Sequence, residues 1–203
     1  MAAELGAGAR AYQEIKQAIL SGDLKQRQKL EIDELAKRWR VSATPVRHAL
    51  AVLTAERLVV AHPARGYSVA FWGEAELAAL YEWRWRLAEI ALDTFQAADA
   101  ASLVGLDHPQ TLIAVLRRMQ EGANAELRRA AVSADERLLG AYRVEPEILP
   151  QTDRELAALN ETLDDGDAKR AHQRLKVFFR RRIADAALIR ARASVKALPR
   201  NGV

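Results

Sequence analysis

The sequence contains no cysteine and no hydrophobic run long enough to cross a membrane. The absence of cysteine excludes disulfide bonds and thiolate metal sites, and it is consistent with a reducing compartment. No stretch approaches the roughly 18 consecutive apolar residues of a membrane-spanning helix, and MAAELGAGAR lacks the apolar run of a signal peptide. We therefore expect a cytoplasmic protein with no membrane partner.

Residue types that support catalysis are also scarce. There are four histidines, and they are scattered along the chain at His48, His62, His108 and His172. The sequence has no cysteine nucleophile, no histidine cluster and no glycine-rich phosphate loop, so nothing in it indicates a reaction. We expect no enzymatic activity and no cofactor.

Positive charge is concentrated in the first third of the sequence. Residues 1–70 contain 11 Lys+Arg and 7 Asp+Glu, a net charge of +4, whereas residues 71–203 contain 20 of each, a net charge of zero. A basic segment joined to a neutral one favours a polyanionic partner for the first segment. Four charges are few, so the charge pattern alone leaves chance composition as an alternative.

Hydrophobic spacing in the N-terminal part predicts three short helices followed by a β-hairpin. The helices are predicted at 11–21, 31–38 and 43–55, with a polar connector at 24–30, and the strands at 58–62 and 67–71. The turn PARG joins the strands, and its glycine can adopt a positive φ. This order of elements is that of a winged helix-turn-helix domain.

The rest of the sequence is predicted to be helical throughout. The predicted helices span 74–97, 110–122, 126–142, 152–164 and 167–192, with breaks at LDHP, EPEILP and DDGD. The predicted fold class is therefore mostly α, with an N-terminal winged helix-turn-helix and a C-terminal all-helical bundle. The expected organisation is a flexible N-terminus at 1–10, a DNA-binding domain at 11–72, a helical effector or dimerisation domain at 74–193 and a flexible tail at 194–203.

The stretch VSATPVRHAL places a proline near the start of the third predicted helix. Ser42 is a suitable N-cap, whose hydroxyl can accept a first-turn N–H, and Pro45 then occupies the third helical position, where a missing donor costs little. On a helical wheel one face is apolar and the opposite face is polar or small. The first face consists of Val46, Ala49, Leu50 and Leu53, and the second of Thr44, Arg47, His48 and Ala51.

The second face suits the major groove of DNA. Arg47 can donate two hydrogen bonds to guanine or to phosphates, and Ala51 permits close approach. At the tip of the predicted wing, Arg65 can reach phosphates or the minor groove, and Gly66 lets the backbone come close. His62 flanks the tip and could also touch phosphate. A solvated helix face is the alternative interpretation of the stripe when it is considered alone.

The segment LEIDELAKRWRVSATPVRHALAVLTAERLVVAHPARGYSVA resembles the DNA-binding domain of GntR-type bacterial transcription regulators. The shared motifs are LA at 35–36, VS at 41–42, TPVR at 44–47, AL at 49–50, LV at 58–59 and RG at 65–66. The resemblance implies a repressor or activator that binds a palindromic double-stranded DNA operator as a homodimer. The DNA-binding residues are then predicted to be Ser42, Thr44, Pro45, Arg47, His48, Arg65 and Gly66.

Two positions depart from the pattern of that family. Ala43 stands where an arginine commonly precedes the TPVR motif, and Asp33 stands where a basic residue is frequent. Both positions typically contact DNA in relatives. The departures do not count against DNA binding, but they put any operator sequence borrowed from a relative in doubt.

The helical part resembles the effector domain of the FadR-like (FCD) branch. LYEWRWRLAEIAL at 80–92 and LDDGDAKRAHQRLKVFF at 163–179 carry this resemblance. It implies a helical bundle that binds a small metabolite, often a carboxylic acid, and that in many members holds a divalent metal through one aspartate and three histidines. The aspartate matches Asp135, but the histidine positions hold Leu139, Leu156 and Phe178. One carboxylate without imidazoles is a poor transition-metal site, so we predict no metal.

The chain between Leu139 and Leu156 is short, which leaves three alternatives for the effector cavity: it is smaller, open to the dimer partner, or absent. Its lining would be apolar. Arg84 is the natural anchor for an acid, and the candidate effector residues are Arg84, Asp135, Leu139, Leu156 and Phe178. The alternative for Arg84 is an ordinary buried ion pair with Asp135. The function predicted is a homodimeric DNA-binding regulator controlled by a carboxylate or apolar metabolite; the alternative is a helical domain that only dimerises.

Two further groups of residues in the helical part have open interpretations. Trp83 and Trp85 lie on either side of Arg84, so they could form an interface or pack in the core. The run RRR at 180–182 is interpreted as the solvated face of the last helix, because the surrounding domain is neutral.

Overall fold

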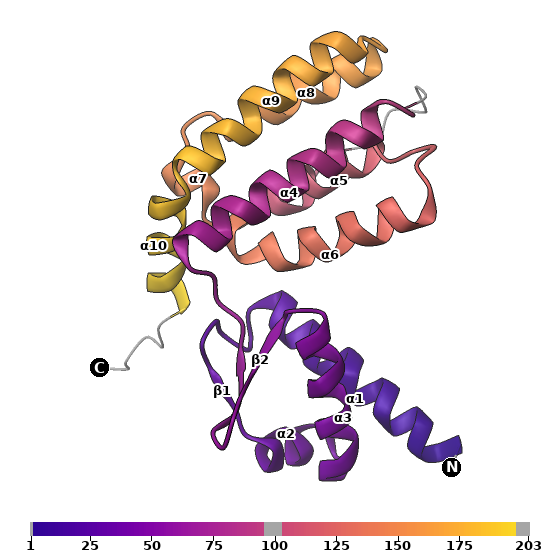
Figure 1. Cartoon of the computed structure of the whole chain (residues 1–203), viewed down its shortest axis with the longest axis vertical. Coiled ribbons are helices and arrows are strands. Elements are labelled where there is room, and N and C mark those ends of the chain that lie inside the picture. Colours follow the sequence, from indigo (N-terminus) through magenta and orange to yellow (C-terminus); the bar gives the residue numbers. More distant parts are fainter. Residues whose placement is uncertain (1, 96–102, 198–203) are drawn as a thin grey trace. The chain divides into compact units, whose positions relative to one another are not determined.

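The computed structural model describes residues 2–95 and 103–197. Within these ranges the chain forms two compact units, one in residues 2–71 and 194–197 and the other in residues 72–95 and 103–193. The N-terminal elements in Figure 1 are α1 (Ala2–Ser21), β1 (Lys29–Leu30), α2 (Ile32–Trp39), α3 (Ala43–Ala55), β2 (Val59–His62) and β3 (Gly66–Val69). In the described part of the chain, no helix is both long and apolar enough to cross a membrane.

The N-terminal unit is a winged helix-turn-helix, as predicted. Its three strands form an antiparallel sheet in the order β1-β3-β2, and the hairpin register pairs Val59 with Val69 and His62 with Gly66. One apolar core joins the three helices to the sheet. Its buried members are Ala11, Ile15, Ala18, Leu24, Leu30, Leu35, Val46, Ala49, Leu50, Leu53, Leu58, Val59 and Val69.

Two features of this unit differ from the prediction. Helix α1 begins at Ala2, although residues 1–10 were expected to be flexible. Alanine, glutamate and leucine in AAELGAGA are strong helix formers, and their preference outweighs the cost of two glycines. The connector at 24–30 is not merely polar, because Leu24 is buried and Lys29–Leu30 forms strand β1 against β3.

The second unit is a helical bundle, which confirms the predicted fold class. Its elements are α4 (Glu74–Leu92), α5 (His108–Arg118), α6 (Ala125–Tyr142), α7 (Glu145–Ile148), α8 (Thr152–Asp164), α9 (Ala168–Ala184) and most of α10 (Ala186–Ala197), as far as Ala193. Helix α4 packs against α6 and α9, α5 packs against α6 and α8, and α8 lies beside α9 (Figure 1). Side chains at three N-caps fix where helices start, since Asp107, Asn124 and Asp167 each accept a first-turn backbone N–H.

Several helix boundaries in this unit differ from the prediction. Helix α5 spans His108–Arg118 rather than 110–122. Helix α4 ends at Leu92 rather than at 97, so Phe95 lies beyond it. The predicted break EPEILP contains the one-turn helix α7, whose proline lies in the first turn, where no N–H is needed. The long helix expected at 167–192 is divided at Asp185, where φ is −95° and ψ is 12°. The Asp185 carbonyl accepts the Ile189 N–H and so begins α10.

Candidate nucleic-acid interface

The turn between α2 and α3 is built by backbone hydrogen bonds. Arg40 ends α2 in the left-handed conformation, with φ at 53°, and its N–H donates to the Lys37 carbonyl at 3.3 Å. The Val41 N–H then donates to the Ala36 carbonyl at 3.0 Å. This compact turn leaves three residues, 40–42, between the end of α2 and the start of α3 at Ala43.

Helix α3 turns its apolar face to the core and its polar face to solvent. The buried residues are those predicted, namely Val46, Ala49, Leu50 and Leu53. Thr44, Arg47, His48 and Ala51 are exposed on the opposite side. Within residues 2–95 and 103–197, no hydrogen bond or ion pair engages the Arg47 guanidinium, so its donors are available to a ligand.

Ser42 occupies the predicted N-cap position, but its hydroxyl does not cap the helix. Its backbone is extended, with φ at −77° and ψ at 168°, and the side chain accepts no hydrogen bond from the first turn. The predicted cap bond was therefore wrong. An N-cap hydroxyl usually accepts the N–H of the second or third helical residue, and the third residue here is Pro45, which has no N–H.

The wing tip has the conformation that its sequence predicts. The Arg65 N–H donates to the His62 carbonyl at 3.0 Å, and Gly66 has a φ of 83°, in the region that favours glycine. Arg65 is exposed at this tip. His62 ends β2, and its Nε2 lies 2.8 Å from Ser68 Oγ, so a strand-end contact occupies one of its ring nitrogens.

A groove of about 640 Å³ runs along α3 beside the N-terminal half of α1. The residues that line it are Ala7, Gly8, Ala9, Tyr12, Ser42, Thr44, Pro45, His48, Ala49 and Val52. Ser42, Thr44, Pro45 and His48 therefore share this groove, whereas Arg47 and Arg65 are outside its lining. The candidate DNA contacts divide into a groove-lining set and a set outside the groove, which comprises Arg47, Arg65 and Gly66.

A local ion pair anchors α1 to the end of α3. Lys16 Nζ lies 3.0 Å from Glu56 Oε2, and the Tyr12 hydroxyl donates to Glu56 Oε1 at 2.6 Å. Burial, followed by the hydrogen bond to Glu56, raises the pKa of Tyr12. The Glu56 carboxylate is thus committed to groups on α1.

In the helical unit, the predicted effector residues Arg84 and Asp135 are bonded to each other. Arg84 is fully buried, with Nε 2.7 Å from Asp135 Oδ1 and Nη2 3.2 Å from Oδ2. The Tyr142 hydroxyl donates to the same Oδ1 at 3.0 Å. Burial is the largest single effect and lowers the pKa of Arg84. The charge of Asp135, the interaction with Tyr142 and the hydrogen bond to Asp135 together exceed it, so the pKa is raised. Arg84 therefore forms the buried ion pair with Asp135 that was given as the alternative to an effector anchor.

The three apolar members of the predicted effector set differ in burial. Leu156 and Phe178 are buried, whereas Leu139 is only partly buried. The Arg182 guanidinium carbon lies 3.3 Å from the centre of the Phe178 ring, and the Phe179 ring packs edge-on against Phe178. Phe178 is thus held in a cation–π contact.

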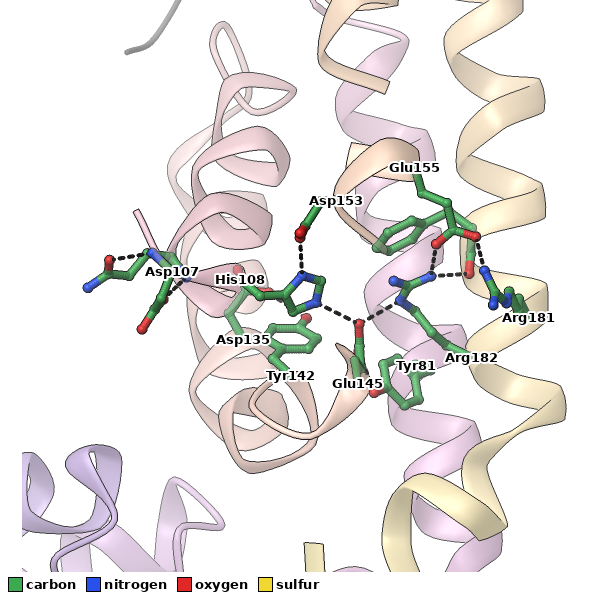
Figure 2. Close-up of polar contacts among 12 residues, drawn as sticks. Tyr81, Asp107, His108, Asp135, Tyr142, Glu145, Asp153, Glu155, Arg181 and Arg182 are labelled. Atoms are coloured by element: carbon green, nitrogen blue, oxygen red, sulfur yellow. Dashed lines mark hydrogen bonds and ion pairs between the residues drawn. The ribbon is translucent and has the colours of Figure 1, made fainter. Parts of the chain in front are cut away.

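Sequence patterns missed a buried polar cluster centred on Glu145, which Figure 2 shows. Glu145 is fully buried and accepts hydrogen bonds from the Tyr81 hydroxyl at 2.7 Å and from Arg182 Nε at 2.9 Å. His108 Nε2 lies 3.2 Å from the same carboxylate. The signal in the sequence was a glutamate in the apolar connector RVEPEIL, which was interpreted only as a break.

The arginine run at 180–182 is not a uniform solvated face. Arg180 is exposed, but Arg181 contacts Glu155 and the Pro150 carbonyl, and Arg182 has no exposed surface. Arg182 is buried because Glu145, Glu155 and the Phe178 carbonyl receive its donors. The prediction was wrong for Arg182, since it considered net charge and not distant partners.

The two tryptophans beside Arg84 have opposite environments. Trp85 is buried, with Arg86 stacked 4.4 Å from its ring centre, whereas Trp83 is 49% exposed. Core packing therefore describes Trp85, whereas Trp83 has the exposure that the interface interpretation requires.

In the described ranges, no group of three or more His, Cys, Asp or Glu side chains is arranged to hold a metal ion. Only Asp135, among the four positions that match the metal-binding pattern, carries a metal-ligating side chain. The absence of a metal stays a prediction.

Comparisons with known proteins agree with the geometry of the N-terminal unit. Residues 7–69 match the model of the gntR family of bacterial regulatory proteins. The N-terminal unit is therefore similar to that family, and the matched segment is less than half of the chain. A curated relative, the HTH-type transcriptional repressor GlaR of Escherichia coli (strain K12), is 36% identical over 73 residues. That match spans 36% of this chain and only about a third of the relative's length, at 33%.

Solved structures resemble this chain over most of its length. A GntR transcriptional regulator from Rhodococcus sp. RHA1 superposes with a TM-score of 0.75 at 16% identity, covering 89% of this chain and 97% of that one. E. coli McbR/YncC gives a TM-score of 0.63 at 18% identity, covering 90% and 97%. At these identities the likeness establishes the fold, in which a winged helix-turn-helix precedes a helical domain.

Proposed function

We propose that this protein is a GntR-type, sequence-specific, DNA-binding transcription regulator. The observation that carries the proposal is the exposed stripe of Thr44, Arg47 and His48 on the second helix of a GntR-type helix-turn-helix, with Arg65 at the wing tip. In such domains the second helix enters the major groove, where an arginine can pair with guanine. Ser42, Pro45 and Gly66 complete the proposed DNA contacts.

The regulator acts as a homodimer on a palindromic operator. Two recognition helices related by a two-fold axis fit half-sites about one helical turn apart. Trp83 and Ile90 are 49% and 53% exposed and lie seven residues apart on α4, so they share one face of that helix. An exposed apolar face of this kind supports an interface between two copies.

Control by a small metabolite is a second element of the proposal. Arg84 Nη1 and Arg182 Nη2 are buried, and neither donor has a partner within the described residues. Buried charged donors are normally satisfied, so these two favour a small acceptor such as a carboxylate near Arg84 and Asp135. Leu139, Leu156 and Phe178 supply the apolar surroundings. The alternative, in which the helical unit only dimerises, leaves operator affinity unchanged by every carboxylate tested.

Replacing Arg47 tests the DNA-binding proposal. An operator is first selected from a random duplex library, and the affinities of the natural chain and Arg47→Ala are then compared on it and on an unrelated duplex. Loss of a base-reading arginine should cost about 1–3 kcal/mol at the operator and relax specificity at one position. Arg117→Ala, which removes an equally exposed helical arginine from the other unit, is the control. An Arg47→Ala chain that keeps the natural affinity and specificity would contradict the proposed role.

A further inference from the structure

Helix α9 carries an unusual concentration of positive charge. Between Ala168 and Ala184 it contains seven Lys+Arg and no Asp or Glu. The unit around it, Trp72–Ala193, holds 18 Lys+Arg and 20 Asp+Glu, so its net charge is −2. The cations of α9 are therefore a local feature of a unit that is slightly acidic.

Only some of these cations are neutralised inside the protein. Arg181 Nη1 lies 2.5 Å from Glu155 Oε1, and Arg182 Nη1 lies 3.1 Å from Oε2 of the same carboxylate. Glu155 is thus shared by two guanidiniums. Neither Arg154 of α8 nor Arg174 of α9 has a hydrogen bond or ion pair among the residues the structure describes.

The two uncommitted arginines line one groove between α8 and α9. The groove measures about 590 Å³, within the size range of small-molecule sites. Its lining comprises Pro150, Gln151, Arg154, Glu155, Ala158, Gln173, Arg174, Val177, Phe178 and Arg181. The carboxylate in this lining is the shared Glu155, so the groove has an excess of positive charge.

The groove also offers an apolar surface beside its cations. Val177 is 66% exposed, although it is a hydrophobic residue on a charged helix. Ala158 and Pro150 line the groove from the α8 side, and Phe178 lies beneath, almost fully buried. A ligand that only carried charge would gain nothing from this surface, and a purely apolar ligand would leave both arginines unpaired.

We propose that the α8–α9 groove binds a small organic anion with an apolar body, such as an alkyl carboxylate. Arg154 and Arg174 hold the carboxylate, because guanidinium donors match its two oxygens, and the alkyl chain covers Val177 and Ala158. This site is separate from the interior pair of Arg84 and Asp135, neither of which lines the groove. It does not depend on the proposed DNA-binding function.

Methyl NMR of the full chain tests the proposal with octanoate as the probe. The Val177 methyl signals, assigned with Val177→Ile, should shift and saturate with octanoate. Two comparison probes separate the contributions: 1-octanol has the alkyl chain without the charge, and inorganic phosphate has charge without the chain. Both should bind about tenfold more weakly than octanoate or not at all, since each lacks one of the two interactions.

Charge-removing variants complete the test. The double variant Arg154→Gln, Arg174→Gln should weaken octanoate binding by about tenfold or more. Lys176→Gln removes a neighbouring exposed cation of α9 that does not line the groove, and it should leave the affinity within about twofold. Absence of octanoate-induced shifts at Val177, equal binding of 1-octanol or phosphate, or equal losses in the double variant and Lys176→Gln would each overturn the proposal. Unchanged signals from core methyls confirm that the variants remain folded.

Discussion

Three consecutive arginines, 180–182, occupy three different environments in α9. Neighbouring helical residues point about 100° apart, so one faces solvent, one reaches the start of α8 and one enters the bundle. The partners of Arg182 are Glu145 and Glu155, which lie 37 and 27 positions earlier in the sequence. Local patterns cannot identify such partners, and this is why the burial of Arg182 was not predicted.

Substitution of Arg182 should strongly destabilise the helical unit. Arg182→Met leaves the Glu145 carboxylate buried without its cation, and breaking a buried ion pair in this way costs about 3–5 kcal/mol. The free energy of unfolding in urea measures the loss. Arg180→Met, an exposed change on the same helix, should alter it by less than about 0.5 kcal/mol.

A double-mutant cycle with Glu145→Gln distinguishes the ion pair from simple packing. The losses of unfolding free energy in Arg182→Met and Glu145→Gln should add up to more than the loss in the double variant, because each single change leaves the other charge without its partner. Additive losses would show that Arg182 and Glu145 contribute independently, contrary to their 2.9 Å contact.

Two buried tyrosines should make the helical unit less stable at high pH. Burial, with the nearby carboxylates Glu145 and Asp135, raises the pKa of Tyr81 and Tyr142 well above the ordinary value of 10.0. Between that value and the raised pKa, the unfolded chain loses the tyrosine protons while the folded chain retains them. The free energy of unfolding is therefore unaffected by these groups below pH 10 and falls as the pH rises further. Urea unfolding at pH 9 and pH 11 measures this, and equal stabilities would contradict it.

At the scale of single elements, the sequence predicted best where strong start and stop signals flank the element. The bounds of α3 and α8 agree with the predictions at 43–55 and 152–164. The break at Asp185 was missed because the hydrophobic spacing continues across it, even though aspartate often begins a helix. The start of α1 was missed because that helix was placed from hydrophobic spacing, which begins only in the second half of α1.

The wing depends on the backbone of Gly66. Gly66→Ala should destabilise the hairpin by about 1–2 kcal/mol, since its φ of 83° is strained for any side chain. An added Cβ would meet nothing within 4 Å, so the cost would be conformational and not steric. Operator affinity should also fall in Gly66→Ala, because Arg65 at the wing tip loses its fixed position.

Gly8→Ala is the matched control for the wing substitution. Gly8 lies inside α1, and a Cβ there also meets nothing within 4 Å. Without a positive φ, alanine should stabilise this helix by about 0.5–1 kcal/mol. Thermal unfolding of the two variants should therefore move in opposite directions, and a shift of the same sign would contradict the backbone explanation.

At the scale of the whole molecule, the sequence predicted the fold class and the order of its parts. The residues of the candidate DNA interface could also be chosen from sequence, because they lie within one helix and one turn. The residues of the Glu145 cluster and of the α8–α9 groove could not be predicted from sequence, because each set comes from separate elements of the chain. Long-range contacts of this kind leave no spacing pattern.

Native mass spectrometry of the purified chain tests two whole-molecule expectations. The proposed regulator should give the mass of two copies. It should carry no zinc, nickel or manganese, because Leu139, Leu156 and Phe178 cannot donate to a metal as histidines would. A monomer at micromolar concentration would contradict the proposed dimer, and stoichiometric metal that is lost in Asp135→Asn would contradict the second expectation.

The shared carboxylate of Glu155 also restricts how this protein can evolve. Replacing Glu155 by an apolar residue leaves the guanidiniums of Arg181 and Arg182 competing for fewer acceptors, and replacing Arg182 strands Glu145. A well-packed apolar set of similar volume would often be as stable as the buried charges. Each single step toward it passes through a less stable protein, so these positions in α7, α8 and α9 should be inherited as a set and exchanged together.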